Sequence, residues 1–282
     1  MYPLSNSLFQ GSVMKMFRQG DASDIAGILA FARKEPELNL FLIGDLEFYG
    51  LDNDFIDVWI EETSEGKLKT VLLRYHRNFL LHSETNDYDR ASVWKIVQAH
   101  DGTFLNCSGA CFSYLKEELP ADAEIRPMKM ARMRQMIAPA FRLMPARIAA
   151  PDDAERIVRS MFQIEEFRSM LTDSLEARIR LSKAKMTDGF STHFIIEADG
   201  VVIANANTIA VSRKAAMIGG VFTLPAYRGK GLATSVVAML CQNLLERDIA
   251  PVLFFENPKA ATIYHKLGFV DFAEWIIVCL QY

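Results

Sequence analysis

The stretch of residues 215–233 constrains the fold of this chain most strongly, because its local pattern changes twice within a short distance. An apolar run at residues 215–224 has the composition of a β-strand and ends at Pro225. Glycines at positions 229 and 231 follow, and apolar residues then recur at helical spacing. Those apolar residues are Leu232, Val236, Val237, Leu240, Leu244 and Leu245. The stretch therefore predicts a strand, a tight glycine turn and a helix.

A connection of this kind can bind an anion. Gly229 and Gly231 let the backbone approach a ligand closely, and the free N–H groups of the first helical turn lie at the positive end of the helix dipole. Arg228 and Lys230 add positive charge. The order of residues 229–234 matches neither G-x-x-x-x-G-K-[ST] nor G-x-G-x-x-G, which argues against nucleotide hydrolysis and dinucleotide binding. The loop predicts a pyrophosphate site, and the alternative is a basic surface turn.

The order of predicted elements is the same in the two halves of the chain. In the second half it is a strand at residues 146–150, helices at 152–167 and 172–185, strands at 193–197, 201–210 and 215–224, a helix from Gly231, a strand at 252–255, a helix at 258–267 and a strand at 275–280. The pair Asp199-Gly200 predicts a tight turn, so the three consecutive strands should form an antiparallel meander.

The first half gives nearly the same series. It is a strand at residues 15–18, helices at 21–33 and 39–49, strands at 55–61, 68–75 and 79–83, a helix at 88–99, a strand at 103–107, a helix at 111–118 and a closing strand at 128–135. We interpret the repeat as an internal duplication with domains at residues 1–140 and 141–282. The alternative for the first half is an unrelated α+β domain.

Charge and composition exclude several classes of protein. A net charge of -4 argues against a dedicated nucleic-acid binder, because such proteins neutralise phosphates with Lys and Arg. The cysteines form no metal-ligand set with the five histidines, so we expect them reduced and packed, with no metal bound. They are Cys107, Cys111, Cys241 and Cys279. No leader and no stretch near the ~18 apolar residues of a membrane span is present, which predicts a cytoplasmic protein without membrane contact.

Two motifs resemble those of the GCN5-related N-acetyltransferases (GNAT). Arg228, Gly231 and Ala233 match the R/Q-x-x-G-x-G/A pattern of motif A in that family, after the usual strand and proline. Downstream, the pattern N-x-x-A-x-x-x-Y-x-x-x-G-F is matched by Asn257, Tyr264, Gly268 and Phe269. The resemblance covers residues 141–282. It implies an α/β (α+β) fold of two acyl-CoA N-acyltransferase-like domains, each a mixed, mostly antiparallel sheet flanked by helices.

The resemblance also implies acetyl-CoA as co-substrate and a primary amine of a small molecule or peptide as acceptor. The coenzyme residues that it implies are Phe222, Thr223, Leu224, Arg228, Gly229, Lys230, Gly231, Leu232, Ala233, Thr234 and Asn257. Lys259 and Lys266 are further candidates for the remaining phosphate, with solvated surface charge as the alternative for each cation. Tyr264 would protonate the leaving thiolate, with core packing as its alternative role, and Asn257 would also cap a helix.

The general base is not specified by the resemblance. The family often has a glutamate on the strand before motif A, where this chain has Gly219 and Gly220. The candidates are then a water chain or one of Glu165, Glu166, Glu256 and His193. The first two lie in the segment of residues 161–170, which the family uses to shape the acceptor pocket, and could attract a cationic amine.

The first half departs from the family at the corresponding loop, residues 84–89, which is acidic and lacks glycine. We expect no coenzyme there, and a role as scaffold or as one wall of the acceptor site. A non-catalytic acyl-CoA sensor is the alternative function for the whole chain. An aminoacyl transferase that uses charged tRNA is disfavoured by the intact loop and the acidic charge. A homodimer is compatible with the sequence, which does not determine the oligomeric state.

Overall fold

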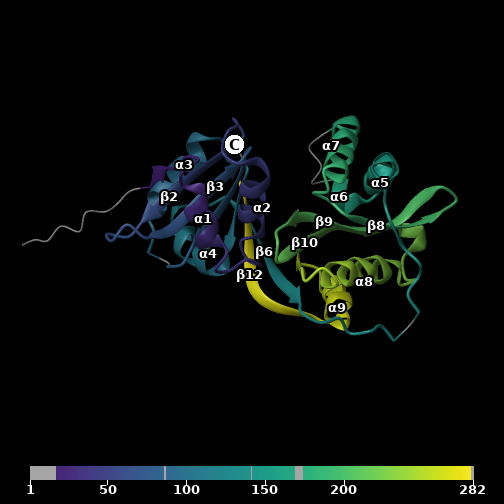
Figure 1. Cartoon of the computed structure of the whole chain (residues 1–282). Coiled ribbons are helices and arrows are strands. Elements are labelled where there is room, and N and C mark those ends of the chain that lie inside the picture. The colour runs from purple at the N-terminus through teal and green to yellow at the C-terminus, as the bar shows by residue number, and fades with distance from the viewer. Residues whose placement is uncertain (1–16, 86, 141, 169–173, 281–282) are drawn as a thin grey trace, which may run out of the picture.

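A single twisted sheet runs through the molecule, with helices on both of its faces (Figure 1). The computed structural model describes residues 17–85, 87–140, 142–168 and 174–280. Within them the strands are ordered β1-β2-β3-β4-β5-β12-β6-β11-β10-β9-β8-β7. Only β4–β5 and β10–β11 pair in parallel among these strands. The predicted class, a mixed and mostly antiparallel sheet flanked by helices, is confirmed.

The N-terminal half supplies β1 to β6. Its elements are β1 (Arg18–Gln19), α1 (Ile25–Ala32), α2 (Leu40–Tyr49), β2 (Ile56–Glu62), β3 (Leu68–Tyr75), β4 (Asn78–Ser83), α3 (Arg90–Ala99), β5 (Phe104–Ser108), α4 (Gly109–Leu115), a 3-10 turn (Lys116–Glu118) and β6 (Glu124–Met133). Apolar side chains of α1 and α2 pack on one face of β2 and β3, while α3 and α4 pack on the opposite face. Part of the strand expected at residues 15–18 lies outside the described residues.

The C-terminal half repeats this order. Its elements are β7 (Arg147–Ile148), a 3-10 turn (Pro151–Asp153), α5 (Ala154–Met161), α6 (Glu165–Arg168), α7 (Leu175–Thr187), β8 (His193–Ala198), β9 (Val201–Val211), β10 (Ala215–Thr223), a 3-10 turn (Pro225–Tyr227), α8 (Leu232–Leu245), β11 (Ala250–Phe255), α9 (Pro258–Leu267) and β12 (Phe269–Cys279). Helices α5 to α7 lie on one face of the sheet, and α8 and α9 lie on the other (Figure 1).

Local signals explain most of these boundaries. The turn between β8 and β9 has positive φ at Asp199 (50°) and at Gly200 (77°), the conformation that an Asp-Gly hairpin favours. Helix α9 has Asn257 as its cap and ends at Gly268 with a φ of 103°. The helix expected at residues 152–167 is instead two helices, because 3-10 hydrogen bonds tighten the chain after Met161. The start of the helix expected at residues 172–185 lies outside the described residues.

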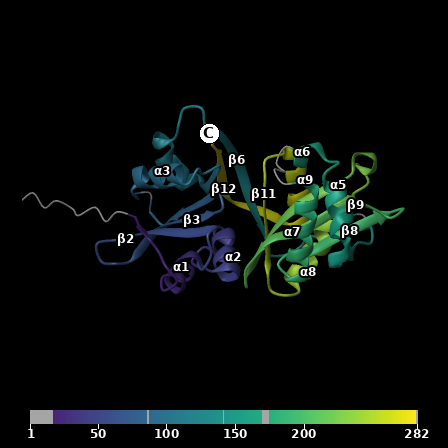
Figure 2. The same cartoon turned by 90° about the horizontal axis from the view of Figure 1, so that it is seen from above.

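The two halves exchange their last strands. The strand expected to close the N-terminal sheet, now β6, does not pair with β5; it lies between β12 and β11. β12 extends from the C-terminal half and pairs with both β5 and β6 (Figure 2). It also begins at Phe269 rather than at residue 275. Each half is therefore completed by a strand that the other half supplies.

A shared apolar cluster joins the halves at the same place. Leu40 from α2 packs with Met130, Met217, Val252 and Trp275, which come from β6, β10, β11 and β12. The four cysteines are buried and free of disulfides, as expected. None of the helices in the described part of the chain has the length and apolarity that crossing a bilayer requires.

Candidate functional site

A gap in the sheet opens between β10 and β11. The two strands pair in parallel only where Ala215–Met217 lies beside residues 250–252. Beyond Met217, β10 continues to Thr223 without pairing with β11, whose opposite edge pairs with β6. The backbone of β10 from Ile218 onward is therefore unpaired on the side of β11.

The glycine loop closes one end of this gap. Gly229 and Gly231 have φ values of 80° and 74°, a region that residues with a Cβ rarely adopt. Gly231 precedes α8, and no side chain caps the helix there. Within the described residues, no main-chain or side-chain acceptor binds the amides of residues 229–231. The loop thus offers free N–H donors at the positive end of α8.

A cavity of about 520 Å³ lies between this loop, the β10 edge and α9. Most of the sequence-predicted residues line it together: Phe222, Thr223, Arg228, Gly229, Gly231, Leu232, Ala233, Thr234, Asn257, Lys259 and Tyr264. Lys230, Leu224 and Lys266 do not line it. The Lys230 ammonium lies over the Tyr227 ring, 5.3 Å from its centre. Arg228 donates to the carbonyl of Thr223 at 3.2 Å and lies 3.4 Å from the Glu166 carboxylate.

Leu224 is in a different position from that expected. Its side chain is buried, and its N–H donates to the carbonyl of Ile203 at 2.9 Å, on the β9 side. Because amide directions alternate along a strand, the N–H of Thr223 faces the gap instead. The Thr223 hydroxyl is also buried without a hydrogen-bond partner among the described residues. Thr223 thus presents an N–H to the gap and has a hydroxyl without a hydrogen-bond partner among the described residues.

Tyr264 lies on the inner face of α9 and borders the cavity. Its ring packs against Phe255 and Phe269, at 5.7 Å and 5.8 Å between ring centres. Burial raises the pKa of the Tyr264 hydroxyl to about 12, so it stays protonated at neutral pH. The hydroxyl has no hydrogen-bond partner among the described residues. Core packing and a hydroxyl at the cavity were the two alternatives for Tyr264, and its side chain combines them.

The glycines at 219 and 220 are required by the local packing. β10 bulges here, since Gly219 is opposite Asn207 while Phe222 is opposite Asn205. A Cβ on Gly219 would lie 2.8 Å from the Ile209 side chain. At Gly220 the φ is 56°, and a Cβ would lie 2.0 Å from Oδ1 of Asn207. A side chain at either position would therefore force its neighbour to move.

A buried polar network occupies the space beside this bulge. Asn205 donates to the carbonyl of Gly220 at 2.7 Å and to Oδ1 of Asn207 at 3.1 Å. Nδ1 of His193 lies 2.9 Å from Oδ1 of Asn205. Because the Asn205 amide nitrogen already donates twice, its oxygen accepts from His193, which places the proton on Nδ1 and leaves Nε2 as an acceptor. Two asparagines on the otherwise apolar β9 were the signal that sequence reasoning missed.

A second cavity, of about 320 Å³, adjoins the first at Phe167, which lines both. Its floor is polar, with Ser191, His193 and Asn207, and its walls are α5 and α7. Burial lowers the pKa of His193, so its imidazole is neutral at pH 7. Of the base candidates, His193 lines this cavity, whereas Glu165 and Glu256 are exposed and line neither cavity. Glu166 lines the first cavity, and residues 169–170 of the expected acceptor segment lie outside the described residues.

Replacing Gly220 with alanine should destabilise the fold more than replacing Gly200. Both positions have positive φ, which costs about 1–3 kcal/mol for alanine. Only at Gly220 must Asn207 also move and break buried hydrogen bonds, at about 1–3 kcal/mol more. Urea denaturation of both variants measures the difference. Equal losses of unfolding free energy would show that the Asn207 contact has no energetic weight.

The corresponding place in the N-terminal half has no such gap. β4 stays paired with β5 over residues 78–81, which is most of its length. The helix that follows, α3, is capped by Asp89, which accepts from the amide of Ser92 at 3.0 Å. A carboxylate therefore occupies the helix start, and phosphate would be repelled there.

Comparison with known proteins agrees with this geometry. A family model described as GNAT acetyltransferase matches residues 187–278, which include the glycine loop and Tyr264. The comparison with curated proteins gives no match. A GNAT-family acetyltransferase from Colwellia psychrerythraea is similar in structure, with a TM-score of 0.61 at 11% identity, over 94% of this chain and 100% of that one.

Two further solved structures are similar over nearly the whole chain. A GCN5-related N-acetyltransferase-like protein from Streptococcus suis gives a TM-score of 0.59 at 15% identity, over 93% of this chain and 100% of that one. A tandem GNAT protein from the clavulanic acid biosynthesis pathway gives a TM-score of 0.59 at 16% identity, over 94% of this chain and 97% of that one. At these identities the likeness establishes the fold. The C-terminal part of the chain is therefore similar in sequence to the GNAT acetyltransferases over residues 187–278, and nearly the whole chain shares the fold of GNAT-family proteins.

Proposed function

We propose that this protein is an N-acetyltransferase that moves an acetyl group from acetyl-CoA to a primary amine of a small molecule or peptide. The transfer occurs by direct attack in a ternary complex. The observation that carries the proposal is the cavity between the splayed strands, which has free loop amides at one end and the Tyr264 hydroxyl inside it. Residues 1–140 act as scaffold without coenzyme, and residues 141–282 hold the coenzyme site.

The residues that line the cavity suit the coenzyme's chemistry. The amides of residues 229–231 and the start of α8 would hold the pyrophosphate, with Arg228 and Lys259 as nearby cations. The free edge of β10 would bind the amide groups of the pantetheine arm. When bound, acetyl-CoA supplies an acetyl group activated as a thioester.

The protein's own groups then have separate roles. The Thr223 amide faces the gap and would donate to the carbonyl oxygen on which negative charge develops. Tyr264 holds a proton at neutral pH and would donate it to the departing sulfur. Neutral His193 would accept the amine's proton at Nε2, directly or through water, because it lines the cavity on the far side of Gly220.

His193→Gln should lower kcat by about a hundredfold, at the lower end of the range for a positioned base. Glutamine keeps a polar group beside Asn205, so coenzyme affinity should not change. The defect should shrink as the pH rises towards the pKa of the amine, because a neutral amine needs no base. Steady-state rates from pH 6.5 to 9.5 measure this. A defect of constant size across that range would assign His193 a structural role only.

Two experiments test the proposal as a whole. Calorimetric titration of the full chain with acetyl-CoA should give one site per chain, and two equivalent sites would contradict the assignment of the N-terminal half as scaffold. A panel of amines is then screened for release of free thiol. Binding without turnover of any amine would favour the alternative, a non-catalytic acyl-CoA sensor, and absence of binding would remove both functions.

A further inference from the structure

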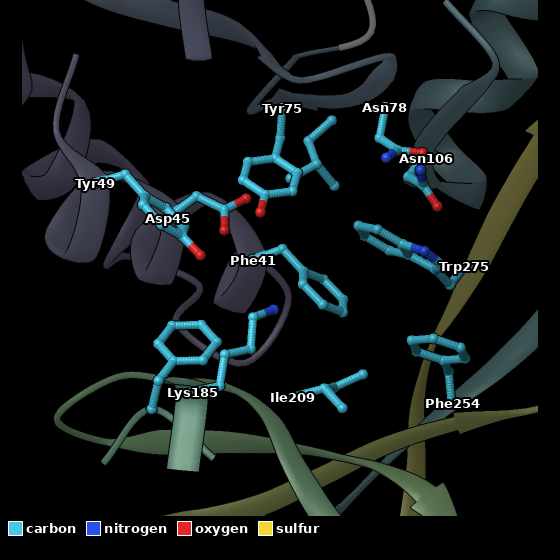
Figure 3. Close-up of a pocket in the computed structure, with 12 residues that line it drawn as sticks. Phe41, Asp45, Tyr49, Tyr75, Asn78, Asn106, Lys185, Ile209, Phe254 and Trp275 are labelled. Atoms are coloured by element: carbon cyan, nitrogen blue, oxygen red, sulfur yellow. The ribbon is translucent and has the colours of Figure 1, made fainter. Parts of the chain in front are cut away.

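A third cavity, of about 240 Å³, lies where the two halves meet (Figure 3). The N-terminal half contributes α2 and strands β3 to β5, and the C-terminal half contributes α7, β9, β11 and β12. Lys185 and Ile209 border both this cavity and the second cavity, so the two are neighbours. The described coenzyme-loop residues do not line it. We call it the inter-half pocket.

One face of α2 supplies an acid between two aromatic rings. Phe41, Asp45 and Tyr49 are spaced four residues apart, so their side chains share a face of the helix and all line the pocket. The Asp45 carboxylate extends into the pocket beside Tyr75 (Figure 3). It forms no hydrogen bond or ion pair with any other described residue. Burial raises the pKa of this carboxyl to about 7.

The opposite side of the pocket supplies a base. The Lys185 side chain extends from α7 into the pocket (Figure 3), and its ammonium lies 5.2 Å from the centre of the Phe190 ring. No carboxylate of the described residues lies within 4.0 Å of it. Burial lowers the pKa of Lys185, although Asp45 is near enough to oppose that shift. The pocket therefore contains one acid and one base that do not pair with each other.

The geometry points to a small zwitterion of the amino acid type as the ligand of the inter-half pocket, its ammonium facing Asp45 and its carboxylate facing Lys185. A simple cation would satisfy Asp45 but be repelled by Lys185, and a simple anion would be repelled by Asp45. A zwitterion gives both half-buried groups a partner without adding net charge. This inference does not rest on the proposed function.

The aromatic residues that line the inter-half pocket indicate that the ligand has an apolar side chain. Beyond Phe41, Tyr49 and Tyr75, the lining includes Phe254 and Trp275. Aromatic rings favour an ammonium at their faces and an apolar body between them. The volume lies below the ~300–1,000 Å³ typical of sites for drug-sized molecules, so a single amino acid suits it better than a peptide.

A matched set of three compounds tests the charge pattern. The full chain, without acetyl-CoA, is titrated calorimetrically with phenylalanine, phenethylamine and 3-phenylpropionate at pH 8. Phenylalanine should bind about tenfold or more tightly than either compound that lacks one charge. The same comparison with leucine, isoamylamine and isocaproate separates charge from ring stacking. Equal affinity of amine and amino acid, or no binding of either amino acid at millimolar concentration, would overturn the inference.

Substitutions locate the site. Asp45→Asn and Lys185→Gln should each weaken amino acid binding about tenfold or more, while Glu47→Gln, an exposed acid on the same helix, should leave it unchanged. Unchanged binding in both pocket variants would place the ligand elsewhere and overturn the assignment.

Thermal stability separates lost binding from lost folding. The folded-state pKa of Asp45 is raised above its ordinary 3.8, so its ionisation destabilises the apo protein increasingly from about pH 4 to pH 7. Asp45→Asn should therefore raise the melting temperature at pH 8 by roughly 2–4 °C or more, and by less at pH 5. A variant that melts higher yet binds less supports a ligand-binding role. A lower melting temperature at pH 8 would assign Asp45 to stability and overturn its role as a ligand.

Discussion

Tyr264→Phe should lower kcat by about 10²- to 10⁴-fold, with acetyl-CoA affinity nearly unchanged. The substitution removes only the hydroxyl, which has no hydrogen-bond partner among the described residues and borders the cavity. The ring contacts with Phe255 and Phe269 remain, so α9 should keep its position. The measurement is steady-state acetylation of a good acceptor amine, with calorimetric titration of acetyl-CoA beside it.

Tyr227→Phe is the matched control for this prediction. Tyr227 lines the same cavity, on the side of the glycine loop, and its ring lies under the Lys230 ammonium. Removing its hydroxyl should leave kcat within about twofold, because the ring contact persists. An unchanged kcat in Tyr264→Phe would exclude Tyr264 as the acid. A loss of similar size in both variants would indicate disturbance of the cavity rather than loss of a proton donor.

Separating the chain at residue 140 should prevent either half from folding alone. Without β12, the N-terminal half has an unpaired edge on β5, and without β6 the C-terminal half has one on β11. The missing strands also supply core residues, among them Trp275, Ile276 and Val278 of β12. Burying such side chains stabilises a fold by about 1.5–3 kcal/mol each, which is a large share of a typical domain's stability.

Co-expression of residues 1–140 with 141–282 is the test of this exchange. Each half alone should be insoluble or lack a cooperative thermal transition, whereas the two together should form a soluble complex. Circular dichroism and size-exclusion chromatography distinguish these outcomes. A C-terminal half that melts cooperatively by itself would show that β6 is dispensable to it.

Local signals allowed much of the fold to be predicted. The Asp199-Gly200 turn, the helix from Pro258 to Leu267 and the glycines of the loop each act over a few residues. Two motifs in the right order then identified most of the residues that line the cavity between the glycine loop, the β10 edge and α9. Such features depend on backbone preference and spacing, which a single sequence contains.

Contacts between residues far apart in the chain could not be predicted from such local signals. The pairing of β12 with β5 depends on residues far apart in the sequence, and the same elements in the same order are compatible with two separate sheets. The direction of the Leu224 amide follows from a bulge that begins at Gly219. No turn motif in the sequence predicts that bulge. That Asp45 and Lys185 line one pocket can be seen only once both halves are placed together.

The position of β12 also delays completion of the N-terminal sheet during synthesis of the chain. At about 5–20 residues per second, the ribosome takes on the order of ten to thirty seconds to make residues 141–282 after the first half is finished. During that interval β5 has no neighbour on one side, because β12 is made only after β7 to β11. We expect emergence of β12 from the ribosome, rather than completion of residues 1–140, to be the moment at which the N-terminal sheet becomes complete.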